Sequence, residues 1–168
     1  MAWSLNFLLN AQESVQLFDP VPANSQAPDL SQTLENYALY TINPTGLNQI
    51  HAIGHHSFVV RIPDGDGTER TAYMTPSHIF KPGYKLRSSD GIPHQADPGL
   101  HFHGRFAGEQ KKTLSLSVYA NHAVAIFGSE KGNVVLAPLD NPDGSLQAWH
   151  VAYPDLQIAG QMPFECHM

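Results

Sequence analysis

The chain has little charge, and little of it is basic. Of its 168 residues, 14% are Asp, Glu, Lys or Arg, against about 25% in an ordinary soluble domain. Nine residues are Lys or Arg, and the net charge is −6. Nucleic-acid-binding proteins gather basic residues into a patch that neutralises phosphates, so this composition disfavours nucleic acid as a partner. An acidic surface favours a small molecule or a basic protein instead.

Cysteine is almost absent. The single Cys166 lies three residues from the C-terminal end of the sequence and has no second cysteine with which to form an internal disulfide. Its presence therefore does not identify the compartment. The short tail around it offers neither a helix N-terminus nor basic neighbours, so we interpret Cys166 as a tail thiol rather than a nucleophile.

Long hydrophobic runs are also missing. The first ten residues, MAWSLNFLLN, are apolar, but no Lys or Arg precedes the run. This run is too short to span a bilayer and lacks the basic start of a cleavable export signal. We expect a terminal strand or helix packed on a soluble protein, which is either cytoplasmic or exported by a non-classical route.

Proline and helix-capping signals divide the chain. Residues 18–30 (FDPVPANSQAPDL) contain three prolines and predict an extended arm, which gives an N-terminal arm or linker over 1–28 and a single β-rich domain over 29–168. Asp29 fits an N-cap. Leu30, Leu34 and Tyr37 would then share one face of a short helix near residues 30–40.

Short alternating segments separated by Gly and Pro turns occupy the rest of the chain. They are 47–53, 55–62, 69–74, 99–109, 113–120, 123–127, 133–139 and 146–153. Strands at this spacing predict an all-β or β-dominated α+β fold, a small antiparallel barrel or sandwich with one short N-terminal helix. Exposed edge strands of such a sheet would allow the chain to form an oligomer.

Ten histidines are present, and two of them lie one residue apart in GLHFHGRFAGE (99–109). On a strand, His101, His103 and Arg105 share one face. Neutral imidazoles at this spacing can converge on one metal ion. The alternative is that a half-buried strand simply presents these polar side chains to water.

The same region resembles the cupin superfamily of small β-barrels in part. His101 and His103 match the His-x-His pair of the first cupin motif and Glu109 follows them, while Gly132 and Pro138 match the start of the second motif. The chain departs from the pattern at Gln95 and Leu116, where glycines are expected, and in the long interval between Pro138 and His150. The resemblance implies a divalent metal ion (Fe, Mn, Zn or Ni) held by His101, His103, Glu109 and His150.

A second histidine-containing segment, GHHSFVVRI (54–62), suggests different chemistry. His55 and Ser57 resemble one half of the motif of two-histidine phosphoesterases, whose second copy this chain lacks. His78 with Lys81 and Lys85 could complete a metal-independent acid–base site together with His55 or His56. The candidate catalytic residues are His55 and Arg105.

Three functions follow from these patterns. The first is a small metal-binding enzyme with a histidine-centred site on a β-barrel. The second is a non-catalytic binding module, such as an immunity, adaptor or carbohydrate-binding domain. The third is a histidine-based, metal-independent phosphodiesterase or toxin.

Overall fold

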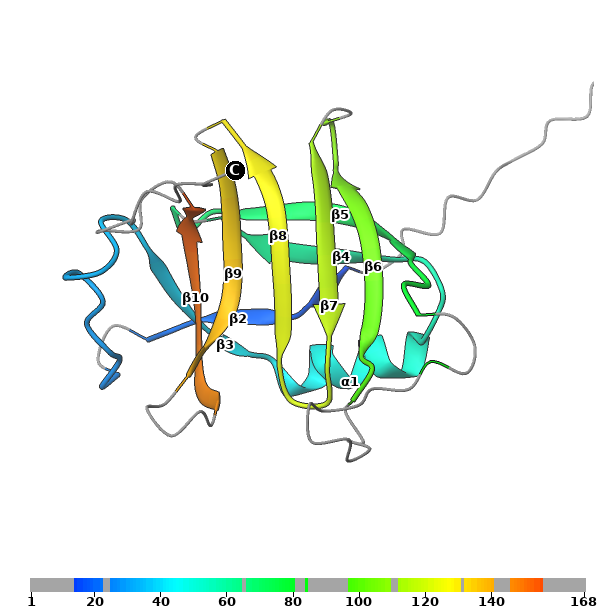
Figure 1. Ribbon diagram of the computed structural model, residues 1–168, viewed down its shortest axis with the longest axis horizontal. Helices are drawn as coiled ribbons and strands as arrows, with labels where there is room; N and C mark the ends of the chain where they lie inside the picture. Colours follow the sequence, from blue (N-terminus) through cyan, green and yellow to red (C-terminus); the bar gives the residue numbers. More distant parts are fainter. Residues whose placement is uncertain are drawn as a thin grey trace, which may run out of the picture.

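The computed structural model describes residues 14–22, 25–64, 66–80, 84, 97–109, 112–130, 132–140 and 146–155. These residues form one ten-stranded sheet that curls into a nearly closed barrel, with one helix across one end (Figure 1). The predicted fold class, a β-dominated barrel with one short helix, is therefore confirmed.

Nine of the ten strands are joined by eight antiparallel pairs, most of them between strands that follow one another in sequence. The strands are β1 (Val15–Gln16), β2 (Phe18–Pro20), β3 (Ala38–Ile42), β4 (Phe58–Pro63), β5 (Glu69–Pro76), β6 (Leu100–Phe106), β7 (Thr113–Val118), β8 (Ala123–Ser129), β9 (Gly132–Asp140) and β10 (Leu146–Pro154). Their order in the sheet is β1-β4-β5-β6-β7-β8-β9-β10-β3-β2. Most of these strands lie where the alternating pattern predicts them.

The barrel is closed by one short segment that pairs with both edges of the sheet. Val15 and Gln16 pair in parallel with Val60 and Arg61 of β4. Two residues later, Phe18 to Pro20 pair antiparallel with β3. Leu17, fully buried, lies where the segment changes neighbour. Residues 18–20 therefore form a strand, although the proline content of 18–30 predicts an arm without regular structure.

The helix begins later in the sequence than predicted. Helix α1 spans Pro44–Ile53, where the sequence predicts a strand over 47–53 after a turn that contains Gly and Pro. Asn43 caps it, since its side chain accepts a hydrogen bond from Gly46 N, and Pro44 occupies the first turn. An Asn-Pro pair suits a turn and a helix start equally well. Leu47 and Ile50, three residues apart, lie on one face of the helix, where both are buried.

No α-helix forms over residues 30–40. Asp29 does act as a cap, because its carboxylate accepts a hydrogen bond from Ser31 N. One turn follows, in which Leu34 N bonds to Leu30 O over 2.8 Å. The Tyr37 hydroxyl then accepts a hydrogen bond from Leu30 N, and the chain enters β3 at Ala38. Asp29 therefore caps a single turn, and the residues that would continue a helix pair in the sheet as β3 instead.

The core fills the inside of the barrel with apolar side chains from every strand. Two edge-to-face aromatic pairs lie within it, Phe58 with Phe102 and Phe106 with Phe127, with ring centres 4.9 and 5.2 Å apart. Helix α1 covers the end of the barrel at which β6 begins, which we call the helix end (Figure 1). We call the opposite end, where β4 passes to β5, β6 to β7 and β8 to β9, the open end.

Candidate functional site

The four predicted metal ligands lie in three different places. His101 and His103 lie on the outer face of β6, whereas Phe102 and Phe106 of the same strand point into the core. Glu109 lies at the open end. His150 is in β10, which β7, β8 and β9 separate from β6. Within the described part of the chain, no three His, Cys, Asp or Glu side chains gather closely enough to hold a metal ion.

His101 is buried, and its ring makes hydrogen bonds and aromatic contacts with neighbouring residues. Its Nε2 lies 2.7 Å from the Pro98 carbonyl oxygen and its Nδ1 lies 2.9 Å from the Ser117 hydroxyl. A carbonyl only accepts, so Nε2 carries the hydrogen and Nδ1 accepts from Ser117. Both nitrogens are therefore occupied. His103, two residues on, is exposed opposite Thr75 and Ser115.

His150 points into the barrel and is 1% exposed. Its ring lies edge-on to Phe18, and its Nε2 accepts a hydrogen bond from Ala123 N, so the ring is neutral with the hydrogen on Nδ1. Among the described residues, Nδ1 has no hydrogen-bond partner. Burial lowers the pKa of His150 to about 4, with a smaller contribution from His122.

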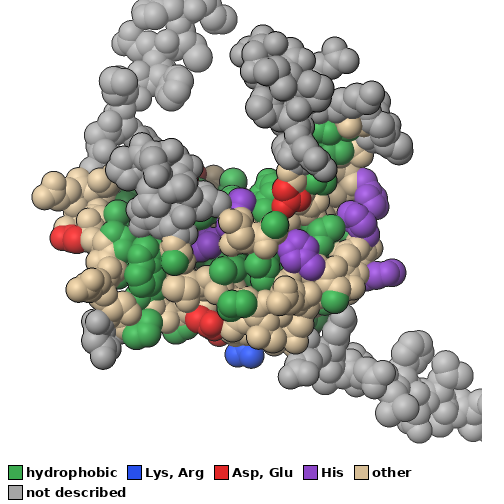
Figure 2. Space-filling model, turned by 90° about the horizontal axis from the view of Figure 1, so that it is seen from below, with side chains coloured by type: hydrophobic (Ala, Val, Ile, Leu, Met, Phe, Trp, Pro, Cys, Tyr) green, Lys and Arg blue, Asp and Glu red, His purple; other side chains and the backbone are tan. Residues whose placement is uncertain are grey.

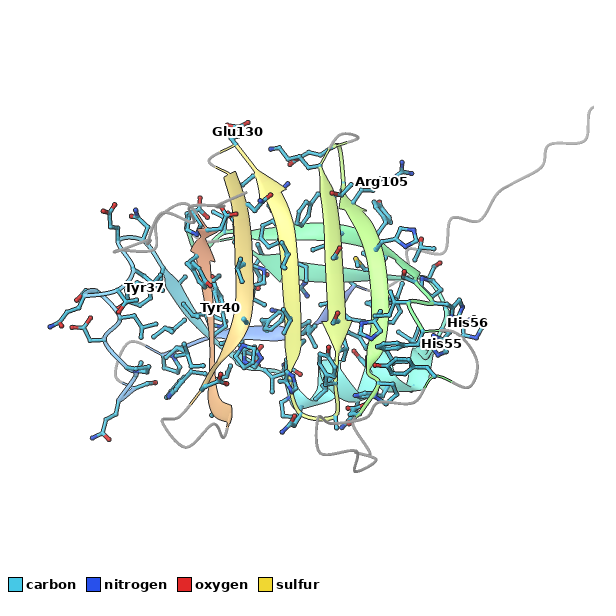
Figure 3. All side chains as sticks on the ribbon, viewed as in Figure 1. Tyr37, Tyr40, His55, His56, Arg105 and Glu130 are labelled. Atoms are coloured by element: carbon cyan, nitrogen blue, oxygen red, sulfur yellow. The ribbon has the colours of Figure 1, made fainter. Side chains whose placement is uncertain are left out.

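The candidate catalytic residues His55 and Arg105 are also apart. Arg105 is exposed on the outer face of β6 toward the open end, whereas His55 and His56 lie at the helix end (Figure 3). His55 instead lies beside His78, with ring centres 5.0 Å apart. The sequence suggests that pairing, but Lys81 and Lys85 lie outside the described residues, so the phosphodiesterase hypothesis stays a prediction.

A cavity of about 590 Å³ lies at the open end of the barrel. Its walls come from the segment before β3, the turn between β4 and β5, and the ends of β6, β8 and β10. The side chains that line it are Glu35, Asn36, Tyr37, Ala38, Asp64, Asp66, Arg70, Glu109, Lys112, Ser129, Glu130, Val134 and Pro154. Five of these side chains are carboxylates and two are cationic, so the described part of the lining is acidic, and we call this site the acidic cavity.

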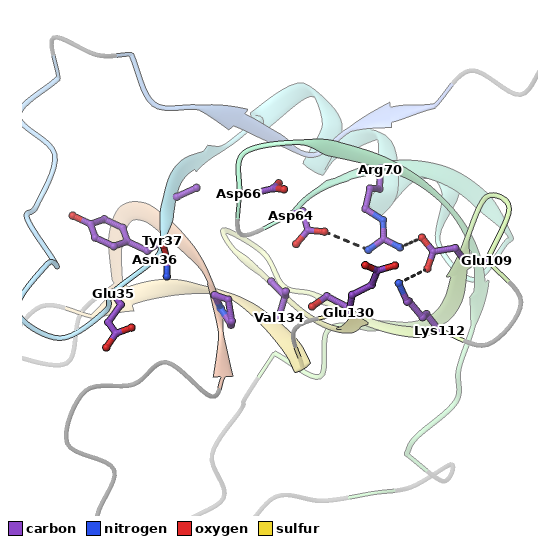
Figure 4. A pocket seen from close by; sticks show the side chains of 13 residues that line it. Glu35, Asn36, Tyr37, Asp64, Asp66, Arg70, Glu109, Lys112, Glu130 and Val134 are labelled. Atoms are coloured by element: carbon purple, nitrogen blue, oxygen red, sulfur yellow. Dashed lines mark hydrogen bonds and ion pairs between the residues drawn. The ribbon is translucent and has the colours of Figure 1, made fainter.

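Arg70 organises one wall of this cavity. Its guanidinium lies 3.6 Å from the centre of the Phe106 ring, on which it stacks as a cation on an aromatic face. It bonds to Asp64 on one side and to Glu109 on the other (Figure 4). Lys112 Nζ lies 3.1 Å from the second oxygen of Glu109. Both cations of the cavity are thus already paired with carboxylates.

The remaining carboxylates among the described lining residues are Glu35, Asp66 and Glu130. Figure 4 shows Glu130 on the same side of the cavity as Arg70 and Lys112, with Tyr37 and Glu35 across from them. The hydrogen bond from Lys112, together with the charge of Arg70, lowers the pKa of Glu109, so this residue stays ionised. The Tyr40 hydroxyl donates a hydrogen bond to the Asp64 carbonyl oxygen, and burial, reinforced by the carboxylates of Glu69, Asp66 and Asp64, raises the pKa of Tyr40 to about 12.

Of the residues that line this cavity, only Glu109 is a site residue predicted from the sequence. One signal could have pointed to Arg70 alone: it alternates with Ala72 and Met74, so a single cation shares the inward face of β5 with core residues. The other lining residues come from segments far apart in the chain. Their proximity depends on the closed barrel.

A second hollow, of about 630 Å³, lies between α1 and the strands β1 and β4. Among the described residues that line it, Arg61 alone is charged, so this hollow indicates less about a ligand than the acidic cavity does.

Comparisons with known protein families, with curated proteins and with solved structures gave no match for this chain. Within the described residues, no helix is both long enough and apolar enough to cross a membrane. The function must therefore be inferred from the chemistry of the sites themselves.

Proposed function

We propose that this protein is a non-catalytic binding module that binds a small, positively charged molecule in the acidic cavity at the open end of the barrel. The observation that supports the proposal is the excess of carboxylates over cations among the described residues that line one concave site. Its volume of about 590 Å³ lies within the range of about 300–1,000 Å³ that is typical of small-molecule sites.

The charge arrangement supports a cation as the ligand. Arg70 and Lys112 are held by Asp64 and Glu109, so their charge is already offset inside the wall. Glu35 and Glu130 are exposed and line the same cavity. An amine or guanidinium group entering between them gains a charge-assisted hydrogen bond, whereas an anion meets like charge.

Binding is favoured over catalysis because the ionised groups are fixed by pairing. A general acid needs a pKa near the working pH, but Lys112 and Arg70 move the pKa of Glu109 in the opposite direction. The carboxylates of this cavity are therefore suited to recognising charge. A basic protein is the other partner that the sequence suggests, and the concave shape and the volume of the cavity favour a small molecule over it.

Calorimetric titration of the full chain tests this proposal, with arginine amide and spermidine as cationic probes and citrate as an anionic comparison. We expect both cations to bind, and citrate not to. Glu130→Gln should weaken cation binding several-fold, because it removes one carboxylate from the cavity. Glu69→Gln is the matched control, since Glu69 hydrogen-bonds to Gln16 outside the cavity lining.

Two results would count against the proposal. One is the absence of binding by either cation. The other is an equal loss of affinity in Glu130→Gln and Glu69→Gln, which would mean that only the overall charge of the molecule matters.

A further inference from the structure

We propose that His55 and His78 form a binding site for one divalent late transition-metal ion, such as Zn²⁺, at the helix end of the barrel. The two imidazole rings lie with their centres 5.0 Å apart and their planes inclined by 42°. Both side chains are exposed. This pair is separate from the His101, His103, Glu109 and His150 set that the sequence suggests.

The spacing of the two rings matches shared coordination. With Zn–N bonds of about 2.1 Å and a tetrahedral angle, two imidazoles on one ion hold their ring centres roughly 5 Å apart. Imidazole nitrogen is also the donor that Zn²⁺, Cu²⁺ and Ni²⁺ accept readily in proteins. The rings can therefore take up an ion between them with little movement of the backbone.

Both ligands follow backbone positions that are fixed by hydrogen bonds. Gly54 ends helix α1 with φ of 59°, and its N–H bonds to Ile50 O over 2.9 Å, which sets the direction of the chain at His55. On the other side, Ser77 N bonds to His101 O over 2.7 Å immediately before His78. The segments before and after the paired strands β4 and β5 thus present one histidine each. Because the fold already holds both segments in place, binding a metal ion costs less conformational entropy.

The surroundings suit a surface ion with open coordination positions. Histidine side chains gather on one side of the face seen in Figure 2. The net charge of −6 attracts cations to the molecule as a whole. With two protein ligands, the ion keeps further positions for water or for a donor from another molecule. This site lies at the opposite end of the barrel from the acidic cavity, so neither proposal depends on the other.

The test uses untagged full-length protein, stripped of metal with EDTA, dialysed, and titrated calorimetrically with ZnCl₂. We expect one equivalent of Zn²⁺ to bind at this site, and its affinity to fall at least tenfold in His55→Ala and, separately, in His78→Ala. His103→Ala is the matched control, because His103 is also an exposed histidine on the barrel but lies on the outer face of β6.

Paramagnetic Cu²⁺ gives an independent readout of position. At substoichiometric Cu²⁺, the ring proton signals of His55 and His78 should broaden before those of His103. The proposal is overturned if Zn²⁺ does not bind, if either alanine variant keeps full affinity, or if His103→Ala causes the same loss as His55→Ala.

Discussion

At the scale of single residues, Arg70 fixes the positions of two carboxylates at the open end. An inward-facing cation in a strand of core residues is costly unless it is paired. Here the Phe106 ring, Asp64 and Glu109 surround the guanidinium, whose side chain is 17% exposed. The arrangement holds two carboxylates in fixed positions on the cavity wall. Arg70 is thus a positioning residue for the acidic site.

Replacing Arg70 with methionine should reduce the free energy of unfolding by about 1–3 kcal/mol, because Asp64 and Glu109 would face each other without the cation between them. Urea denaturation of the two proteins measures this change. Arg105→Met is the control, since Arg105 is exposed on the outer face of β6, and it should change stability by less than about 0.5 kcal/mol. Equal effects of the two substitutions would show that Arg70 does not hold Asp64 and Glu109 in place.

At the scale of elements, helix α1 and the closing strand β1 are in direct backbone contact. A Cβ atom added at Gly46 would overlap the carbonyl oxygen of Gln16 in β1. Glycine is therefore required at this position in the first turn of the helix. The contact matters because the same segment joins the two edges of the barrel.

Gly46→Ala should consequently destabilise the protein by about 1–3 kcal/mol, the usual range for overpacking. Thermal unfolding followed by circular dichroism would show it as a lower melting temperature. Gly128→Ala is the matched control, because an added Cβ there meets only the Lys112 side chain at 3.9 Å. If Gly46→Ala melts at the temperature of the unsubstituted protein, the close approach of α1 to β1 is wrong.

Most elements could be predicted from the sequence, because alternation of polar and apolar residues directly reports a strand with one face in the core. The helix could not, since Asn43 and Pro44 begin a turn and a helix with the same chemistry. Closure of the barrel could not be predicted either. It depends on Leu17, where a six-residue segment changes neighbour within a proline-containing stretch.

The surroundings of the predicted site residues, and the acidic cavity, were harder to predict because they also depend on contacts between segments that are distant in sequence. Alternation correctly puts His101, His103 and Arg105 on one face of β6. It does not reveal that this face lies outside the barrel, nor that Pro98 and Ser117 occupy both nitrogens of His101. The acidic cavity is assembled from turns that are distant in sequence, and no local motif marks it.

At the scale of the whole molecule, His150 couples stability to pH. Phe18 lies against its ring, Ala123 N donates to its Nε2, and His122 is the nearby titratable group that affects it. Burial lowers its pKa from 6.5 to about 4 in the folded protein. The unfolded chain therefore binds more protons between these two pH values, and stability falls as the pH is lowered through that window.

The expected loss attributable to His150 is about 3 kcal/mol between pH 6.5 and 4. Urea denaturation across this range, in the original protein and in His150→Phe, isolates it from the titration of carboxylates that both proteins share. The phenylalanine variant should lose less stability on acidification. Parallel pH profiles for the two proteins would show that His150 is not buried as a neutral ring.

The central claim is that the open end of the barrel binds a cation in its acidic cavity. The most direct measurement is a nuclear magnetic resonance titration of the isotope-labelled full chain with arginine amide, following backbone amide shifts. We predict saturable shifts that cluster at Asp64, Asp66, Glu109 and Glu130, and little change at Gln49 and Ala52 beside the hollow at the helix end. Shifts centred on the helix end, or none at saturating arginine amide, would contradict the account.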